Sequence, residues 1–280
     1  MNESLFSDFV KFSNKQLESG DIDPMYSILE SVFKQRNYDE EQKLWYLFLY
    51  TTFYHVGSAE ILFDKYPKLT LINKKDVQSM PTGIERRGFR GNLNWVDTVN
   101  DLALNYSSMT DFISPVNRKG MPGWKGMRIQ FETIRNNGPW SSYKFADLLA
   151  HVMRYDIQAD DLGNNPAVLG CAETLTGIGR KTIERTISLQ NELFQKSLAA
   201  GITFSGLDQL ETCLCDFHSA LNGHYYVGHD IDMNMKQIPN KDEFWKAREE
   251  VFDSKYLGEK NAWSGERKDL KKRYLETGEL

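Results

Sequence analysis

The chain has 280 residues, of which 40% are apolar and 26% are charged, and three are cysteines. This is the composition of a globular protein with one large core or two smaller ones, and it excludes collagen-like and low-complexity chains. Three cysteines do not make a disulfide framework, and the longest apolar run, near residues 44–54, is too interrupted to span a bilayer. Residues 1–20 lack the pattern of a signal peptide, so we expect a cytoplasmic protein.

The formal net charge of −5 is unevenly distributed along the chain. Between Lys65 and Lys144 there are 13 Lys and Arg residues against 6 Asp and Glu residues, a local net charge of +7. Local charge matters for nucleic-acid binding because each phosphate contact releases counterions. This segment is therefore a candidate nucleic-acid surface, with chance scatter of the charges as the alternative.

Apolar residues that recur at helical spacing predict a mostly α-helical fold with at most a short β element. The predicted helices are Ser4–Ser19, Pro24–Gln35, Asp39–Val56, Ser58–Tyr66, Trp95–Tyr106, one through 145–153, one through 183–194, Leu207–Leu221 and Phe244–Phe252. Gly57 is expected to cap the third helix, and residues 117–124 are expected to form a loop. His224–Ile231 is the one extended run, and we interpret it as a short strand or a loop.

The chain is expected to form one helical catalytic domain over residues 1–252, followed by a polar tail over residues 253–280. No composition shift clearly separates two domains. Residues 156–166 are the best candidate for a hinge or cleft between two lobes.

The segment Ile134–Lys144 predicts a turn between two helices. Gly138 permits a tight turn, and Pro139 suits the first turn of the next helix. A helix start binds phosphate because its N–H groups lack partners within the helix, and Trp140 can lie against a sugar or base. The candidate DNA-binding residues of this segment are Asn137, Gly138, Trp140 and Lys144. The alternative is an ordinary helix corner with a packed tryptophan.

A second glycine turn, in Leu175–Thr182, joins two further helical stretches. Gly177 and Gly179 let the backbone approach a phosphate closely, while Arg180 and Lys181 add positive charge at the same point. The spacing is not that of a Walker loop. It is typical of a helix-hairpin-helix phosphate clamp, and a plain corner between helices is the alternative.

Tyrosine, histidine and aspartate residues are concentrated in His224–Asp232. In an extended segment Asp230 and Asp232 would point the same way. Two carboxylates on one face can hold a hard cation such as Mg²⁺ or share acid–base work, and the neighbouring His229 can titrate near neutral pH. These three residues are candidate catalytic residues, with a solvated acidic turn as the alternative. No motif demands a cofactor, and the metal, if there is one, is not specified.

Cys213, Cys215 and His218 are poorly spaced for zinc, because Cys-x-x-Cys is the usual pair and helical residues two apart face different ways. We expect buried structural thiols there. The sequence also lacks a Ser-His-Asp order, a Rossmann glycine fingerprint and a His-Glu-x-x-His motif.

Four groups of residues carry a resemblance to a known family. They are Arg86–Asn92, Asn137–Lys144 with Ala146–Leu149, Leu210–Cys215, and Tyr225–Asp232. Together they resemble the alpha-glutamyl/putrescinyl thymine pyrophosphorylases, phage base-hypermodification proteins also called amino acid:DNA transferases. That family is related to the helical domain of 5-hydroxymethyluridine DNA kinases. This chain has no P-loop, which favours the transferase branch, and a phage-encoded member would work in the host cytoplasm.

The resemblance implies a fold like that of the helix-hairpin-helix DNA glycosylases, in which a hairpin precedes a catalytic aspartate by about twenty residues. If residues 136–143 form that hairpin, the corresponding carboxylate is Asp156, Asp160 or Asp161. If residues 176–182 form it, no aspartate follows before Asp208. The first placement therefore fits better.

The resemblance also implies a reaction in which an amine from an amino acid or polyamine displaces pyrophosphate from 5-pyrophosphoryloxymethyluracil in DNA. Cations must then stabilise the pyrophosphate, and a carboxylate or histidine must take a proton from the incoming ammonium. The candidates for the anion are Arg86, Arg87, Arg90 and Lys144. The candidates for amine binding, metal binding or proton removal are Asp156, His229, Asp230 and Asp232.

Two other functions fit the same features. A helix-hairpin-helix DNA glycosylase would use one aspartate against the sugar and release a free base, and a non-enzymatic DNA-binding module would use the hairpins alone. The sequence specifies neither the amine and the modified base, nor the preference for single-stranded or double-stranded DNA, nor metal dependence, nor the oligomeric state. No membrane partner is expected.

Overall fold

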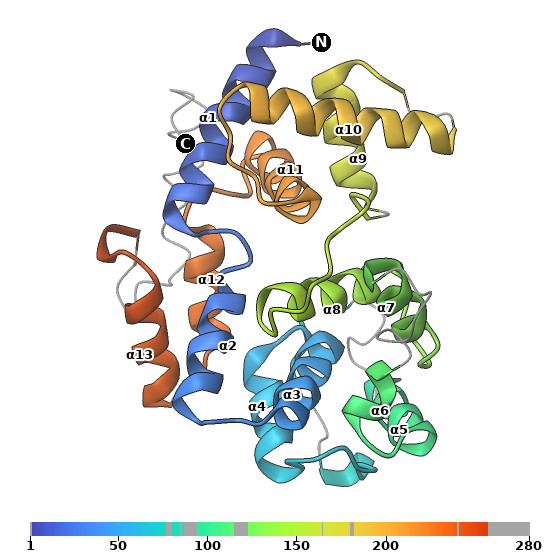
Figure 1. Ribbon diagram of the computed structural model, residues 1–280. Helices are drawn as coiled ribbons and strands as arrows, with labels where there is room; N and C mark the ends of the chain where they lie inside the picture. The colour runs from blue at the N-terminus through green and yellow to red at the C-terminus, as the bar shows by residue number, and fades with distance from the viewer. Residues whose placement is uncertain are drawn as a thin grey trace. The chain divides into compact units, whose positions relative to one another are not determined.

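The computed structural model describes residues 2–76, 80–83, 86, 94–114, 123–163, 165–179, 182–239 and 241–256, and only the backbone of residues 183, 232, 235 and 236. Helices account for 69% of the described residues and none of these residues lies in a strand, which confirms the predicted mostly α-helical fold (Figure 1). No helix in the described ranges is long and apolar enough to cross a membrane. The chain divides into two compact units.

Unit 1 is formed by the described parts of Met1–Met25, Gln158–Lys236 and Arg248–Leu280. Its helices are α1 (Glu3–Ser19), α9 (Pro166–Thr176), α10 (Ile183–Ala199), α11 (Leu207–Leu221) and most of α12 (His229–Gln237), with the 3-10 helix η4 (Ser254–Tyr256). Helix α9 packs against α10 and α11, and α1 packs against α9 and α11. Phe9 and Phe12 of α1 contact Phe217 of α11, with ring centroids 5.4 and 5.5 Å apart. The core of unit 1 therefore joins segments from opposite ends of the sequence.

Unit 2 is formed by Tyr26–Ile157 and Gln237–Ala247. Its helices are most of α2 (Pro24–Gln35), then α3 (Glu40–Phe53), α4 (Val56–Lys65), α5 (Asn94–Asn105), α6 (Met109–Ile113), α7 (Gly123–Glu132), α8 (Pro139–His151) and the start of α13 (Asp242–Val251), with the 3-10 helix η1 (Lys74–Asp76). Helix α3 is central, because every residue of Leu44–Phe53 is buried and α4, α5, α6 and α8 pack around it. The sequence predicted one apolar face for this helix, but its other sides are buried as well.

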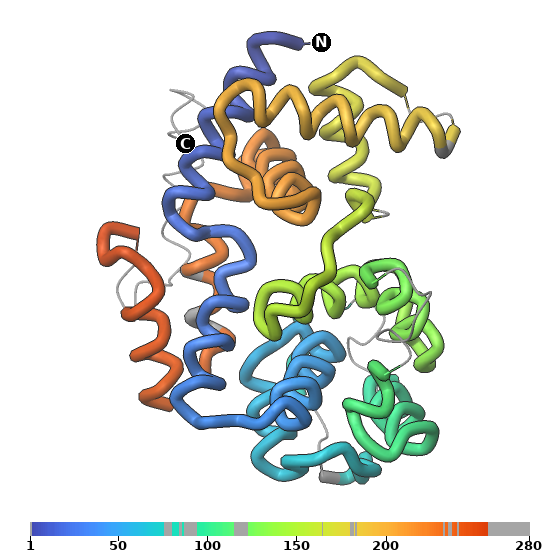
Figure 2. The backbone as a smooth tube through the Cα atoms, viewed as in Figure 1, coloured from blue at the N-terminus to red at the C-terminus, as the bar shows by residue number. Residues whose placement is uncertain are grey.

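The chain passes from α8 to α9 through residues 152–165, of which the described ones are not helical (Figure 2). One of the four points at which the chain crosses between the two units lies in this stretch, after Ile157. The expected extent of the catalytic domain and the expected cleft at residues 156–166 remain predictions. Of the expected tail, Ser254–Tyr256 form η4, and residues 257–280 lie outside the described ranges.

The boundary between α3 and α4 differs from the prediction. Tyr54, and not Gly57, ends α3, with a left-handed φ of +48°. This conformation is uncommon for a residue other than glycine, and the Tyr54 ring stacks on Tyr50 with centroids 5.3 Å apart. His55 then caps α4, since its Nδ1 accepts a hydrogen bond from the N–H of Ser58 at 3.2 Å. Gly57 lies inside α4.

Two other sequence predictions need correction. His224–Ile231 is not one extended run, because helix α12 begins at His229 after a turn. Residues 117–122 of the expected loop lie outside the described residues, but Trp124 belongs to α7 and is buried. By contrast, α2 and α11 begin and end at the predicted residues.

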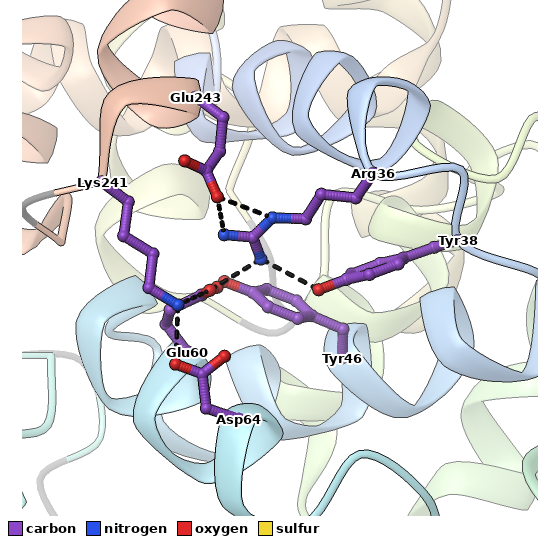
Figure 3. A network of polar contacts seen from close by, with 7 residues as sticks. All are labelled: Arg36, Tyr38, Tyr46, Glu60, Asp64, Lys241 and Glu243. Atoms are coloured by element: carbon purple, nitrogen blue, oxygen red, sulfur yellow. Dashed lines mark hydrogen bonds and ion pairs between the residues drawn. The ribbon is translucent and has the colours of Figure 1, made fainter.

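A charge network centred on the buried Glu60 joins residues 241–243, at the start of α13, to the other helices of unit 2 (Figure 3). Its members are Arg36, Tyr38, Tyr46, Glu60, Asp64, Lys241 and Glu243. The carboxylate of Glu60, 1% exposed, lies 2.6 Å from both Arg36 Nη1 and Lys241 Nζ. It also accepts a hydrogen bond from the hydroxyl of Tyr46 at 2.8 Å. Glu60 therefore balances two cations that come from distant parts of the sequence.

Candidate active-site residues

Helix α8 begins at the first predicted hairpin. Pro139 is its first residue, as predicted, and Gly138 precedes it with a φ of −135°, a conformation that any residue can adopt. The left-handed residue of the turn is Asn136, with a φ of +65°. Its amide donates to the backbone oxygen of Asn94 at 3.2 Å, which helps to hold this conformation. The tight turn therefore depends on the left-handed conformation of Asn136, and not on Gly138, from which the turn was predicted.

Helix α8 carries a polar and aromatic stripe. Residues spaced three and four apart lie on the same side of a helix. The residues at this spacing are Trp140, Tyr143, Lys144, Asp147 and His151. Two of them are charged groups with little exposure, Lys144 at 8% and Asp147 at 2%. Charged residues are seldom buried so deeply, so this side of α8 is a candidate functional surface.

Arg86 adds a second buried cation beside this stripe. The residue is 8% exposed, and its Nε donates to the backbone oxygen of Thr52 at 2.9 Å. Its guanidinium carbon lies 5.9 Å from the centre of the Trp140 ring, within the range of a cation–π contact. Burial lowers the pKa of Arg86 to about 10, so the side chain is still charged at neutral pH. We call Arg86 together with the stripe residues the α8 cluster.

Lys144 and Asp147 form an ion pair within the α8 cluster. Lys144 Nζ lies 3.8 Å from Asp147 Oδ2, and the same oxygen accepts a hydrogen bond from Tyr26 at 2.9 Å. His151 Nε2 lies 3.5 Å from the other oxygen of Asp147. Asp147 therefore lies close to both Lys144 and His151 and can orient both side chains. Nearby, the guanidinium of Arg128 lies 5.5 Å from the Tyr143 ring.

Unit 1 contains a second group of ionisable residues, the carboxylate cluster, whose members are Asp21, Asp216, Asp230, Gln16, Tyr225 and His229. Asp21 follows α1 and is fully buried. Its Oδ2 accepts hydrogen bonds from the N–H of Gly228 at 2.7 Å and from the hydroxyl of Tyr225. Its Oδ1 accepts from the N–H of Ile231 at 2.9 Å. Both carboxylate oxygens of Asp21 thus accept hydrogen bonds from residues at the start of α12.

The carboxylates of this cluster act on one another. Burial, and then the charge of Asp230, raise the pKa of Asp21 to about 7, against the hydrogen bonds that lower it. Burial, and then the charges of Asp230 and Asp21, raise the pKa of Asp216 well above its usual range. The side-chain amide of Gln16 donates to Asp216. Asp21 and Asp216 therefore retain protons at a pH where isolated aspartates have lost theirs.

Asp230 is the more accessible member of the carboxylate cluster, with a side chain that is 36% exposed. His229 Nδ1 lies 2.9 Å from Asp230 Oδ1, so the imidazole and the carboxylate form a pair. Both residues lie in the first turn of α12, and residues two apart on a helix point in different directions. The expectation that this segment is extended is therefore wrong, and the Asp232 side chain lies outside the described part of the structure.

The second predicted hairpin also joins two helices. Gly177 ends α9 with a left-handed φ of +77°, and Thr182 caps α10 by accepting from the N–H of Arg185 at 3.3 Å. Gly179 lies in the turn between them. In the first hairpin, the Asn137 amide donates to the backbone oxygen of Phe131 at 3.4 Å. The structure thus places both glycine segments at helix corners, which is compatible with phosphate clamps and with plain corners alike.

The remaining candidates are placed as follows. Asp156 and Asp160 are exposed in the stretch between α8 and α9, and Asp161 there is partly exposed. The candidates Arg87, Arg90, Arg180 and Lys181 lie outside the described residues. Cys213 is buried in α11, with burial raising its pKa well above the usual range, whereas Cys215 is partly exposed. A buried thiol fits the expected structural role at Cys213.

Sequence reasoning missed several residues of both clusters. Asp147 could have been found, because it follows Lys144 by three residues on a predicted helix and so shares its face. Asp21 and Asp216 gave no local signal, since nothing near either residue distinguishes a buried carboxylate from a solvated one. Only the packing of α1, α11 and α12 shows that they share a site.

Comparison with known families matches residues 17–226 to the family described as amino acid:DNA transferase. The match covers about three quarters of the chain. It includes the whole α8 cluster together with Asp21, Asp216 and Tyr225, and it ends before Asp230. The match confirms the resemblance drawn from the sequence, and it implies a transferase whose partners are DNA and an amino acid. The chain belongs to the amino acid:DNA transferase family.

Proposed function

We propose that this transferase displaces pyrophosphate from 5-pyrophosphoryloxymethyluracil in DNA with the amine of an amino acid or polyamine. The amine nitrogen forms a bond to the exocyclic carbon of the base, and the bond from that carbon to the bridging oxygen breaks. Pyrophosphate leaves with the electron pair. The incoming ammonium must first lose a proton, because only the free amine is a nucleophile.

The observation that carries this proposal is the pair of buried cations in the α8 cluster. Arg86 and Lys144 are each 8% exposed, and Arg86 lies against the Trp140 ring. Cations held in a site with little water stabilise a departing anion more strongly than exposed cations do, because less solvent screens them. A guanidinium also matches the geometry of phosphate oxygens. We assign the departing pyrophosphate to Arg86 and Lys144, with Asp147 orienting the lysine.

Trp140 is the candidate for contact with the base. Its ring is partly exposed and packs edge-on against Tyr54, with ring centroids 4.9 Å apart. A base must leave the duplex before its exocyclic carbon can react, at a cost of a few kcal/mol, unless the DNA is single-stranded. Stacking on an aromatic ring recovers about 1–3 kcal/mol of that cost. A ring beside two cations is suited to a base that carries a pyrophosphate.

We assign the phosphates of the DNA backbone to the two helix corners. The start of α8 at Asn137 and Gly138 offers the positive end of a helix dipole. The corner at Gly177 and Gly179 precedes Arg180 and Lys181 in the sequence, so it combines a close backbone approach with charge. Arg87 and Arg90 follow Arg86 in the same basic stretch and are assigned to the anion on charge alone.

For the amine we propose the pair His229 and Asp230. Asp230 is partly exposed and lies among carboxylates, since its charge acts on both Asp21 and Asp216. A partly exposed carboxylate attracts an ammonium ion, and the paired imidazole can accept its proton. Asp147, by contrast, already faces the ammonium of Lys144. Asp156 is exposed and Asp232 lies in α12, and both remain weaker candidates for this role.

The test is nucleoside mass spectrometry. DNA containing 5-pyrophosphoryloxymethyluracil is incubated with the protein and a panel of amino acids and polyamines, then digested to nucleosides. The proposal predicts a nucleoside whose mass has increased by that of one amine, with loss of the pyrophosphate. Release of a free base would instead show a glycosylase. DNA binding with no product from any amine would show a binding module.

A further inference from the structure

Asp21 has an unusual position for a carboxylate. It lies just beyond α1, yet its two oxygens bind the turn and the first residues of α12, more than 200 residues away in the sequence. The backbone of Asp21 is itself fixed, because its N–H donates to the carbonyl of Gln16 at 3.1 Å and its carbonyl accepts from the Gln16 amide at 3.0 Å. The carboxylate is therefore held in one place before it contacts α12.

The three groups that Asp21 binds are all donors. They are the N–H of Gly228, the N–H of Ile231 and the hydroxyl of Tyr225. The first N–H groups of a helix lack partners within the helix, and a negative charge at that end is also favoured by the helix dipole. Gly228 has a left-handed φ of +95°, so the chain turns sharply where Asp21 holds it. Asp21 thus caps the N-terminus of α12, although it belongs to a distant segment of the sequence.

The residues between the two bonded amides are His229 and Asp230. Because Gly228 and Ile231 are both anchored to Asp21, the backbone that carries this pair is fixed on each side. The Tyr225 ring also lies 5.2 Å from the His229 ring. We propose that Asp21 is a positioning residue of the transfer reaction, which holds the first turn of α12 and so aims His229 and Asp230 at the incoming amine. This inference rests on the role proposed above for Asp230.

The contact between Asp21 and the start of α12 should depend on pH. An ionised carboxylate accepts all three hydrogen bonds, whereas a protonated one must use one oxygen as a donor. The ionisable groups that face Asp21 are Tyr225, Asp230 and, from α11, Asp216. With the pKa of Asp21 near 7, the ionised form is gained as the pH rises through neutrality. Transfer should therefore show an acid limb in this range.

The test compares Asp21→Asn with Asp8→Asn, which changes an exposed aspartate of the preceding helix α1. Asparagine keeps one acceptor oxygen but places an N–H₂ group against one of the donors. Hydrogen–deuterium exchange is measured on a peptide covering residues 226–233 and on a reference peptide within α10. We expect exchange in the first peptide to quicken about tenfold or more in Asp21→Asn, with the reference unchanged and the control like the parent.

Kinetics supply the second readout. We expect kcat of Asp21→Asn to fall about tenfold or more, with KM for DNA within about twofold of the parent and the acid limb absent. Unchanged exchange at residues 226–233 would refute the inference that Asp21 fixes the start of α12. An unchanged kcat across the pH range would refute the inference that Asp21 matters for the reaction. A parent protein with no transfer activity would refute the proposed function, but the exchange result would still decide whether Asp21 holds α12.

A second variant serves if Asp21→Asn does not fold. Tyr225→Phe removes one donor and leaves the carboxylate in place. Because the Tyr225 hydrogen bond lowers the pKa of Asp21, its loss should move the acid limb to higher pH by about 0.5–1 unit. An acid limb that stays in place or moves to lower pH would overturn the inference.

Discussion

Replacing Arg86 by glutamine removes a buried charge from the α8 cluster while keeping a side chain that can donate to the Thr52 carbonyl. A cation about 4 Å from an anionic oxygen, in surroundings with an effective dielectric constant of about 20, is worth about 4 kcal/mol. Arg86 is 8% exposed, so solvent screens it weakly. We therefore expect the rate of pyrophosphate departure to fall by about 10²–10³-fold, the usual loss when one group that stabilises an anion is removed.

The assay is single-turnover release of pyrophosphate with enzyme in excess over pyrophosphorylated DNA and a saturating amine. The matched control is Arg135→Gln, which removes the same charge from an exposed position of unit 2. We expect the control to stay within about threefold of the parent, since an exposed charge contributes little at moderate salt. Arg86→Lys should lie between the parent and Arg86→Gln, because lysine keeps the charge but loses the planar donor geometry.

The reasoning fails if folded Arg86→Gln releases pyrophosphate as fast as Arg135→Gln. Folding is checked by thermal unfolding, and rates are compared well below the melting temperature of each variant. A loss shared equally by both variants would show that net charge, and not the position of Arg86, controls the rate.

Three further predictions concern stability and the carboxylates. Glu60→Gln should lower the free energy of unfolding by about 2–5 kcal/mol, because it removes the buried carboxylate that Arg36 and Lys241 share and leaves each cation with one remaining acidic partner. Asp64→Asn, at an exposed partner of Lys241, should cost less than about 1 kcal/mol. Urea unfolding of both variants checks this, and equal costs would contradict it. The pKa of Asp21 is about 7 in the folded protein and normal in the unfolded chain, so the folded protein binds the proton more tightly. The free energy of unfolding of the parent should therefore fall by on the order of 4 kcal/mol between pH 4 and pH 8 through Asp21 alone. Asp21→Asn should lack that loss, and parallel unfolding curves for the two proteins across this range would show that Asp21 titrates normally. Asp230→Asn should abolish transfer with DNA affinity and melting temperature nearly unchanged, since asparagine keeps the size but not the charge; normal product formation would remove Asp230 from the reaction.

The helices could be predicted where local pattern decides their limits. Pro24 opens α2, and α11 ends just before Asn222 and Gly223, so both ranges followed from the sequence. The end of α3 could not be predicted, because the left-handed residue there is Tyr54 and not a glycine, and its ring contacts Trp140, which lies far along the chain. Propensity alone favoured Gly57 as the cap.

The same distinction applies to the site. Arg86, Trp140 and Lys144 stand out in the sequence as basic and aromatic residues of a locally cationic segment, and the structure brings Arg86 against Trp140. The start of α12 was misjudged because its capping carboxylate, Asp21, comes from the other end of the chain. Local pattern therefore reveals charged residues and helix starts, whereas it cannot reveal which carboxylates become buried together.

The central claim is that the amine attacks carbon and pyrophosphate leaves with the bridging oxygen. It is tested most directly with DNA in which the oxygen between the exocyclic carbon and the first phosphorus is ¹⁸O. The products are the modified nucleoside and pyrophosphate, both analysed by mass spectrometry after one turnover with an amino acid. The account predicts that all the ¹⁸O appears in pyrophosphate and that one amine is joined for each pyrophosphate released. Retention of ¹⁸O on the nucleoside would show attack at phosphorus and would contradict the account.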